Sequence, residues 1–280
     1  MNNVVVKQSA WCDLRPRLIS AFVLGCVAAA CIAAGGAFYI ALVLVVMGGM
    51  AAEAATLFGV SIKSWWGIFY CLWAICSGIL ASSGYGVYFL AFCLGAFIFG
   101  SALWAIMCVI ITAGTALLWL YQVGVWSVVF VIAVVVASDV TAYVVGRLVG
   151  GTKLAPRISP GKTCSGAIGG LIGAILAGLV VAYLSGLGMF VRAIVWAIVL
   201  SIVAQLGDLA ESMMKRSIGA KDSGKLLPGH GGLLDRFDGL VVAAPVAAFV
   251  SLCAVTIKGG AFWCATLDNI ILSLVKVLPI

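Results

Sequence analysis

The sequence predicts an all-α protein, a polytopic integral membrane bundle of roughly eight to ten transmembrane helices. Of its 280 residues, 65% are hydrophobic and only 9% are charged, whereas a soluble domain carries about 25% charged residues. Apolar runs such as residues 125–137 are unbroken, which excludes the alternating pattern of a membrane β-barrel. Because backbone groups in hydrocarbon must pair internally, helices remain as the spanning elements.

Each predicted span is an apolar run close to the ~20 residues that a membrane helix needs. Arg15 and Arg17 precede the first run, which we expect to be a signal-anchor helix rather than a cleaved signal peptide. Only Gly35 and Gly36 separate the first two runs, so a re-entrant pair is an alternative there. The predicted spans are 18–34, 37–57, 65–82, 86–100, 102–121, 125–146, 166–185, 190–210, 240–257 and 262–279.

Basic residues orient the predicted bundle. Four lie in the loop 147–162 and five more lie between 212 and 238. Two spans separate these segments, so both face the same side, and an excess of Lys and Arg marks the cytoplasmic side. We therefore expect a bacterial inner-membrane protein whose polar loops are cytoplasmic.

Charge also divides the chain. Six of the nine carboxylates fall between residues 139 and 238. We expect an N-terminal transmembrane scaffold over 1–124 and a transmembrane catalytic region over 125–280, with cytoplasmic loops at 147–165 and 212–238.

Two carboxylates lie at the ends of apolar runs. Asp139 shares a helix face with Arg147, and Asp208 shares one with Glu211 and Lys215. A carboxylate near hydrocarbon is costly unless it is paired, hydrated or bound to a metal. Asp139 could therefore form a structural salt bridge or the wall of a site. The same choice holds for Asp208 and Glu211, for which Lys215 is the expected ion-pair partner.

The loop 147–162 is basic, rich in glycine and free of carboxylates. Lys and Arg without compensating acids beside a membrane indicate an anion, such as a phosphate headgroup or a nucleotide. The alternative is that these residues only set the topology.

The segment 212–238 mixes five basic residues and three aspartates with several glycines. Glycines let backbone N–H groups approach a polyphosphate, and Lys and Arg neutralise its charge. Asp235 and Asp238, together with Asp208, could hold a divalent ion beside substrate phosphates. These residue types are typical of phosphoryl or nucleotidyl transfer. His230, the only histidine, could contact phosphate or handle a proton, or form a loop hydrogen bond.

These residues also form a motif. It reads S-x-x-K-R at 212–216, K-D-x-G at 221–224 and P-x-H-G-G-x-x-D-R-x-D at 228–238. It resembles the signature of the phosphatidate cytidylyltransferase (CDP-diacylglycerol synthase) family, and residues 17–24, 138–163 and 205–216 are similar to that family too. One position departs from the pattern: Ser165 stands before Gly166 where the family commonly has an acidic or amide residue.

The resemblance implies transfer of CMP from CTP to phosphatidic acid, giving CDP-diacylglycerol and pyrophosphate, with Mg²⁺ as cofactor. We assign the metal to Asp208 and Asp235 as a hypothesis, and Asp222 and Asp238 are candidates for a second metal or for orienting basic residues. The candidate catalytic residues are Asp208, Asp235, Lys215, Arg216 and His230. The candidate substrate-binding residues are Lys221, Asp222, Arg236, Asp238, Ser212, Arg147, Lys153, Lys162 and Asp139. Arg147, Lys153 and Lys162 could bind either the lipid phosphate or the triphosphate.

Two other functions fit parts of the pattern. A CTP-dependent polyprenol or phytol kinase would use similar residues, and a secondary transporter would use intramembrane acids. The expected partners are CTP, phosphatidic acid and the lipid bilayer, with a homodimer as a candidate assembly and no nucleic acid.

Overall fold

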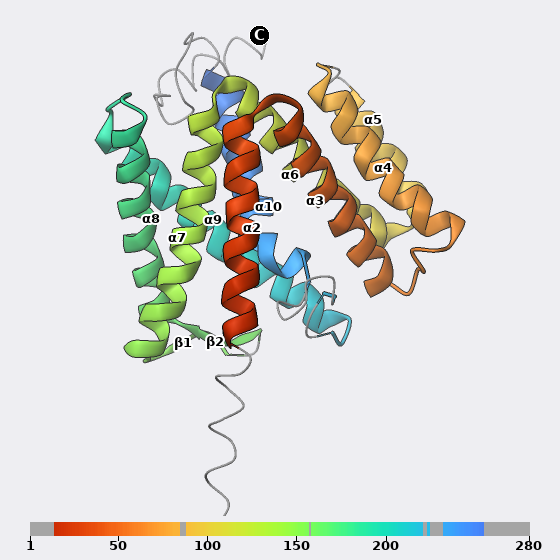
Figure 1. Ribbon diagram of the computed structural model, residues 1–280. Coiled ribbons are helices and arrows are strands. Elements are labelled where there is room, and N and C mark those ends of the chain that lie inside the picture. Colours follow the sequence, from red (N-terminus) through yellow and green to blue (C-terminus); the bar gives the residue numbers. More distant parts are fainter. Residues whose placement is uncertain (1–13, 85–87, 157, 221–222, 225–231, 255–280) are drawn as a thin grey trace, which may run out of the picture.

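The computed structural model describes residues 14–84, 88–156, 158–220, 223–224 and 232–254 (Figure 1). Within these ranges the chain is helical almost throughout, with one short two-stranded sheet. The elements are α2 (Leu14–Ala34), α3 (Gly36–Leu57), α4 (Trp65–Ser82), α5 (Phe89–Gly95), the 3₁₀ helix η2 (Ala96–Phe99), α6 (Ser101–Val123), α7 (Val125–Leu148), β1 (Lys153–Ala155), β2 (Ser159–Thr163), α8 (Cys164–Leu184), α9 (Phe190–Ser217) and α10 (Leu234–Ala254).

The predicted all-α membrane bundle is confirmed. Within the described ranges, six helices are long and apolar enough to cross a membrane: α3, α4, α6, α7, α8 and α9. Helices α2 and α10 occupy the runs predicted at 18–34 and 240–257. The predicted span 262–279 lies outside the described residues. The protein is therefore an integral membrane protein.

The run predicted at 86–100 forms less than a span. Helix α5 and η2 together cover only Phe89–Phe99, and a helix of that length rises ~16 Å, about half the hydrocarbon thickness. Gly100 ends it with a φ of 89°, a conformation that glycine adopts without a steric penalty. Helix α6 therefore begins before the preceding helical stretch is long enough to cross the membrane.

The first two runs form separate, full-length helices rather than a re-entrant pair. Gly35 and Gly36 have φ values of 67° and 50°, so the chain reverses direction over two residues. Figure 1 shows α2 and α3 running in opposite directions from this turn.

Helices α7 and α8 pack at very short range through glycine. A Cβ built on Gly166 would lie 2.7 Å from the carbonyl oxygen of Ala142, and one on Gly146 would lie 2.9 Å from Thr163 Oγ1. Small residues at such crossings let membrane helices approach closely. The pairing holds the end of α7 against the start of α8, where β1 and β2 connect them (Figure 1).

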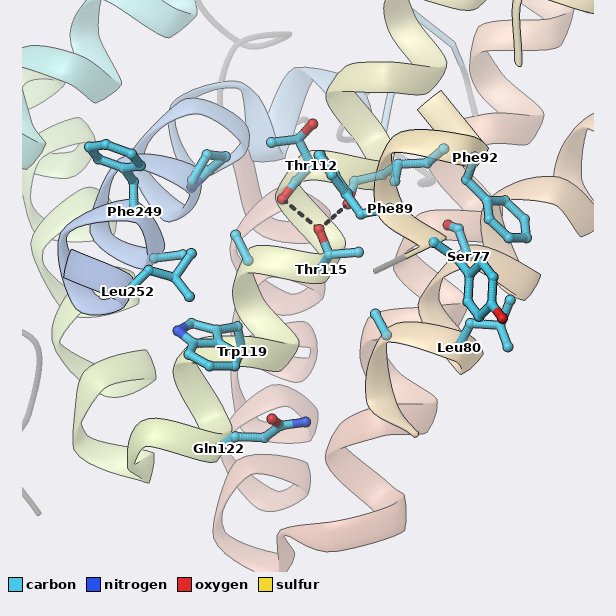
Figure 2. A pocket seen from close by; sticks show the side chains of 16 residues that line it. Ser77, Leu80, Phe89, Phe92, Thr112, Thr115, Trp119, Gln122, Phe249 and Leu252 are labelled. Atoms are coloured by element: carbon cyan, nitrogen blue, oxygen red, sulfur yellow. Dashed lines mark hydrogen bonds between the residues drawn. The ribbon is translucent and has the colours of Figure 1, made fainter. Parts of the chain in front are cut away.

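An apolar pocket of about 450 Å³ lies between α4, α5, α6 and α10 (Figure 2). Its lining contains no charged side chain, and the hydroxyls of Thr112 and Thr115 donate to carbonyls of their own helix. Pro245 to Leu252, in the later turns of α10, face this pocket, whereas the charged residues of α10 lie in its first turns. The charged side chains of α10 therefore lie at the opposite end of the helix from this pocket.

Candidate active site

A polar pocket of about 680 Å³ lies at the end of the bundle that carries the β-hairpin. Its volume is within the ~300–1,000 Å³ typical of ligand sites. The two polar segments predicted to face the same side, 147–165 and 212–238, both contribute to it. The charged lining residues are Asp139, Arg147, Lys153, Lys162, Asp208, Asp235, Arg236 and Asp238.

The hairpin positions the basic residues of the first loop. Strands β1 and β2 are antiparallel, with Lys153 opposite Thr163, although the sequence predicted a loop without strands. Thr163 then caps α8, because its hydroxyl accepts a hydrogen bond from the N–H of Gly166 at 3.1 Å. Lys162 is thereby held one residue before the cap, at the N-terminal end of α8, where the helix dipole also favours anions.

Ser165, where the chain departs from the family pattern, has a contact of its own. Its hydroxyl donates to the carbonyl oxygen of Gly150. Ser165 therefore ties the first turn of α8 to the end of the α7 connection, next to the pocket.

Lys162 pairs with Asp208. Its ammonium lies 2.5 Å from the Asp208 carboxylate, and the two side chains are 24% and 31% exposed. Of the two carboxylates considered as partners of Lys215, Asp208 is therefore not the one that pairs with it: Asp208 reaches across to the hairpin instead. The pair joins the basic loop directly to α9, and both residues line the pocket.

Lys215 lies between two carboxylates. Its ammonium is 2.5 Å from Asp235 and 3.5 Å from Glu211, so the predicted pairing with Glu211 is confirmed. All three side chains are between 12% and 14% exposed. Lys215 does not line the polar pocket itself but supports Asp235, which does.

Asp235 accepts hydrogen bonds from two residues that precede α10. Its Oδ2 atom accepts hydrogen bonds from the N–H groups of Ser223 at 3.0 Å and Gly232 at 3.1 Å. Asp235 lies ahead of the predicted span 240–257. Burial alone would raise its pKa, but the hydrogen bonds from Lys215 and from these N–H groups outweigh burial and lower the pKa. Asp235 is thus held as a carboxylate.

The pocket holds more acid than its described ion pairs neutralise. Asp139 and Asp238 also face it, and within the described ranges neither has a salt-bridge partner. The purely structural salt bridge considered for Asp139 is therefore absent there. The lining carries four carboxylates and four basic side chains, and the two carboxylates without an ion pair offer oxygens that a divalent cation could contact. However, no three His, Cys, Asp or Glu side chains among the described residues are arranged to hold a metal by themselves. Mg²⁺ commonly takes one or two protein carboxylates and completes its shell with substrate phosphates and water.

Of the remaining predicted residues, Arg147 lines this pocket, Ser212 and Arg216 are not among its lining residues, and three lie outside the described ranges. Ser212 Oγ is 3.5 Å from Asp208 Oδ1, and Arg147 donates to the hydroxyl of Tyr143 at 2.7 Å. Arg216 is exposed and contacts the carbonyl of Ala220 at 3.4 Å. Lys221, Asp222 and His230 lie outside the described residues.

Glu53 is a functional candidate that the charge pattern alone did not single out. This carboxylate is only 1% exposed, on α3, and accepts a hydrogen bond from the N–H of Leu234, the first residue of α10. The signal was present, because a single acid inside an apolar run is costly and marks a functional position. The prediction of a scaffold over residues 1–124 leaves this acid without a role.

Comparison with known proteins identifies the family of the chain. Residues 15–254 match the sequence model of a family described as the "Cytidylyltransferase family". A protein named phosphatidate cytidylyltransferase from Brucella abortus (strain 2308) is 59% identical over 121 residues, which cover 43% of this chain and 45% of that protein.

Two further relatives match a similar length. One is a phosphatidate cytidylyltransferase of Staphylococcus saprophyticus, 42% identical over 137 residues, which cover 48% of this chain and 53% of the relative. The other is the uncharacterized protein YnbB of Escherichia coli (strain K12), 42% identical over 125 residues, or 45% of this chain and 42% of that protein. The chain thus spans about half the length of the curated relatives it matches.

Proposed function

The chain belongs to the cytidylyltransferase family, and on this premise we propose that it is a phosphatidate cytidylyltransferase. It would transfer CMP from CTP to phosphatidic acid, giving CDP-diacylglycerol and pyrophosphate. The observation that carries this proposal is the contact between Lys162 and Asp208 inside a polar pocket. A phosphate-binding cation and a candidate metal-binding carboxylate meet there at one end of a membrane bundle.

The location suits the two substrates. Phosphatidic acid presents its phosphate at the bilayer surface, and CTP arrives from water. A polar pocket at the ends of apolar helices is accessible to both. An oxygen of the phosphatidate phosphate attacks the α-phosphorus of CTP, the bond from that phosphorus to the bridging oxygen breaks, and pyrophosphate leaves with the bonding electrons.

The basic residues of the pocket would hold the phosphates. Lys153 and Lys162 approach from the hairpin, Arg147 from the end of α7 and Arg236 from α10. They neutralise negative charge on both substrates, so that one phosphate oxygen can approach another phosphorus. Positioning and charge neutralisation supply most of the catalysis in reactions of this class.

The carboxylates support a metal-assisted reaction. An ionised carboxylate has about four acceptor sites, of which Asp235 uses three for Lys215, Ser223 and Gly232. Asp208 uses two, one on Oδ2 for Lys162 and one on Oδ1 for the hydroxyl of Ser212. Both therefore keep acceptor capacity on the pocket side, and Mg²⁺ held by Asp208 and Asp235 would neutralise the CTP phosphates and the departing pyrophosphate. Asp238 is a candidate for a second metal, and Asp139 forms part of the pocket wall.

We also propose that the pocket opens to the cytoplasm of a bacterial inner membrane, because Lys and Arg concentrate at that end. The homodimer stays a prediction, which cross-linking in native membranes would check.

The experiment that tests the function uses purified protein in detergent with phosphatidic acid, Mg²⁺ and CTP labelled either in cytosine or in the γ-phosphate. We expect cytosine label to enter lipid and γ-label to appear only in pyrophosphate. Entry of γ-label into an alcohol lipid, without cytosine, would instead identify a lipid kinase. Uptake of a substrate into proteoliposomes without CTP would identify a transporter. Either result would overturn the proposal.

A further inference from the structure

Glu53 is a carboxylate buried in an otherwise apolar helix. It lies in α3, and its side chain is among the most deeply buried large side chains of the described residues. A buried carboxylate costs several kcal/mol unless hydrogen bonds or a cation compensate it. None of the salt bridges among the described residues involves Glu53. Its contacts must therefore explain why it is there.

Those contacts are with Leu234, at the start of α10, and with Ser223, which precedes that helix. Glu53 Oε2 accepts hydrogen bonds from the N–H of Leu234 at 2.9 Å and from the hydroxyl of Ser223 at 3.4 Å. Leu234 is the first residue of α10, and the first N–H groups of a helix have no partner within the helix. Glu53 therefore acts as an N-terminal cap supplied by a distant helix, and its negative charge suits the positive end of the α10 dipole.

Two glycines let the carboxylate approach the backbone. A Cβ built on Gly224 would lie 2.9 Å from Glu53 Oε1, and one on Gly232 would lie 2.9 Å from Glu53 Oε2. Glycines of this region are predicted from the sequence to let backbone N–H groups approach a polyphosphate. At these two positions the structure shows a protein carboxylate against the backbone.

Asp235 contacts two of the same residues, Ser223 and Gly232. Ser223 donates its N–H to Asp235 and its hydroxyl to Glu53. Gly232 donates its N–H to Asp235 and packs against Glu53. The position of the pocket residues at the start of α10 thus depends on two carboxylates: Glu53 from α3 and Asp235 from α10 itself.

We propose that Glu53 is a positioning residue of the active site, which fixes Ser223 and Leu234 and thereby the orientation of Asp235, Arg236 and Asp238 toward the substrates. This inference rests on the proposed function for its kinetic consequences. Glu53 acts through Ser223 and Leu234, to which it is hydrogen-bonded. It does not line the pocket itself.

The test compares E53A and E53Q with S77A as a matched control. Ser77 is also a buried polar residue of the N-terminal helices, and its hydroxyl donates to the carbonyl of Ala74 in its own helix. We expect E53A to lower kcat/KM for CTP about 10- to 100-fold, as loss of a charge-assisted hydrogen bond predicts. E53Q should stay within about 3-fold because its amide oxygen still accepts the Leu234 N–H, and S77A should match the wild-type protein.

Hydrogen–deuterium exchange separates this inference from the proposed function. Amides in peptides containing Ser223 and Leu234 should exchange faster in E53A but not in E53Q or S77A, whether or not the protein transfers cytidylyl groups. If the wild-type protein is inactive, the proposed function fails while the exchange result still tests the positioning. Unchanged exchange in E53A would overturn the inference.

Gly224 provides an independent variant that leaves Glu53 in place. G224A should push the segment away from the carboxylate and raise exchange there. G124A is its control, since a Cβ on Gly124 meets nothing within 4 Å. In the E53A background the cost of G224A in kcat/KM should fall below about 2-fold, because the obstructing side chain is gone. Equal costs in both backgrounds, or a G224A protein that behaves like G124A, would contradict the positioning role.

Discussion

The ammonium of Lys162 and the carboxylate of Asp208 lie 2.5 Å apart, although one belongs to the β-hairpin and the other to α9. This pair connects the two polar segments that the sequence singles out. Each partner compensates the charge of the other in the free protein. Phosphates would compete for Lys162, and a cation would compete for Asp208.

K162A tests the basic half of this pair. The substitution removes a phosphate-binding charge and leaves Asp208 beside Asp139 without its cation, so we expect kcat/KM to fall about 100-fold. K162R should retain more activity than K162A because it keeps the charge. The measurement is cytidylyl transfer at varied CTP concentration.

Lys63 supplies the control for that prediction. It is exposed in the α3–α4 connection and lies outside the polar pocket. K63A should behave as the wild-type protein. If K162A also stays within about 2-fold of wild type, Lys162 does not hold substrate.

The two candidate metal ligands should respond differently to neutralisation. D208N and D235N are both expected to lose about 1,000-fold in turnover if the carboxylates hold Mg²⁺. Only D235N should lose stability, because Asp235 accepts hydrogen bonds from Lys215, Ser223 and Gly232. Loss of about 2 kcal/mol would lower the midpoint of thermal unfolding by about 5 °C.

Asp208 provides the contrast. Its one described salt bridge is partly exposed, and such pairs contribute little to stability. D208N should therefore unfold within about 2 °C of the wild-type protein. An active D208N protein would remove Asp208 from the metal site, and a D235N protein of unchanged stability would show that Asp235 does not hold the segment.

The helices were predictable because lipid imposes a simple requirement. A run of ~20 apolar residues must be a helix in hydrocarbon, so the observed bounds of α3, α4 and α6 differ from the predicted ones by no more than two residues. The sequence predicts that Asp208 and Lys162 lie at the same end of the bundle, because the predicted topology places both polar segments on one side of the membrane. Their direct contact was not, because side-chain pairing depends on how far the hairpin folds back toward α9.

Other features depend on tertiary contacts that carry no periodic signal. The hairpin formed by β1 and β2 is short and contains Gly161 and Pro160, which argue against a strand on local propensity. The early end of η2 follows from the backbone conformation at Gly100. Glu53 was visible as a single acid, but nothing in the sequence indicates that its partner is the start of α10.

The pH dependence of stability should report on Asp235. Its pKa is lowered in the folded protein, so the carboxylate stabilises the fold above the ordinary carboxyl pKa. That contribution is lost as the pH falls through the lowered pKa. The unfolding midpoint of the wild-type protein should therefore exceed that of D235N at pH 6, and the difference should shrink below about pH 4.

That prediction is measured as a difference, because other carboxylates also titrate in this range. Both proteins are unfolded thermally in the same detergent from pH 3 to pH 7. A difference that stays constant over the whole range would show that ionised Asp235 does not contribute in the way its hydrogen bonds indicate.

G166A tests whether the close packing of α7 and α8 supports the pocket. The added Cβ would lie 2.7 Å from the carbonyl oxygen of Ala142 and 3.3 Å from the Cα atom of Gly146. Both are backbone atoms, so neither can move without shifting a helix, and overpacking of this kind costs about 1–3 kcal/mol. We expect a lower unfolding midpoint together with reduced turnover, because Thr163 and Lys162 sit at the displaced end of α8.

G25A is the matched control: Gly25 is also helical, and a Cβ there meets nothing within 4 Å. If G166A and G25A unfold at the same temperature, the helices adjust without cost and their packing does not set the position of Lys162.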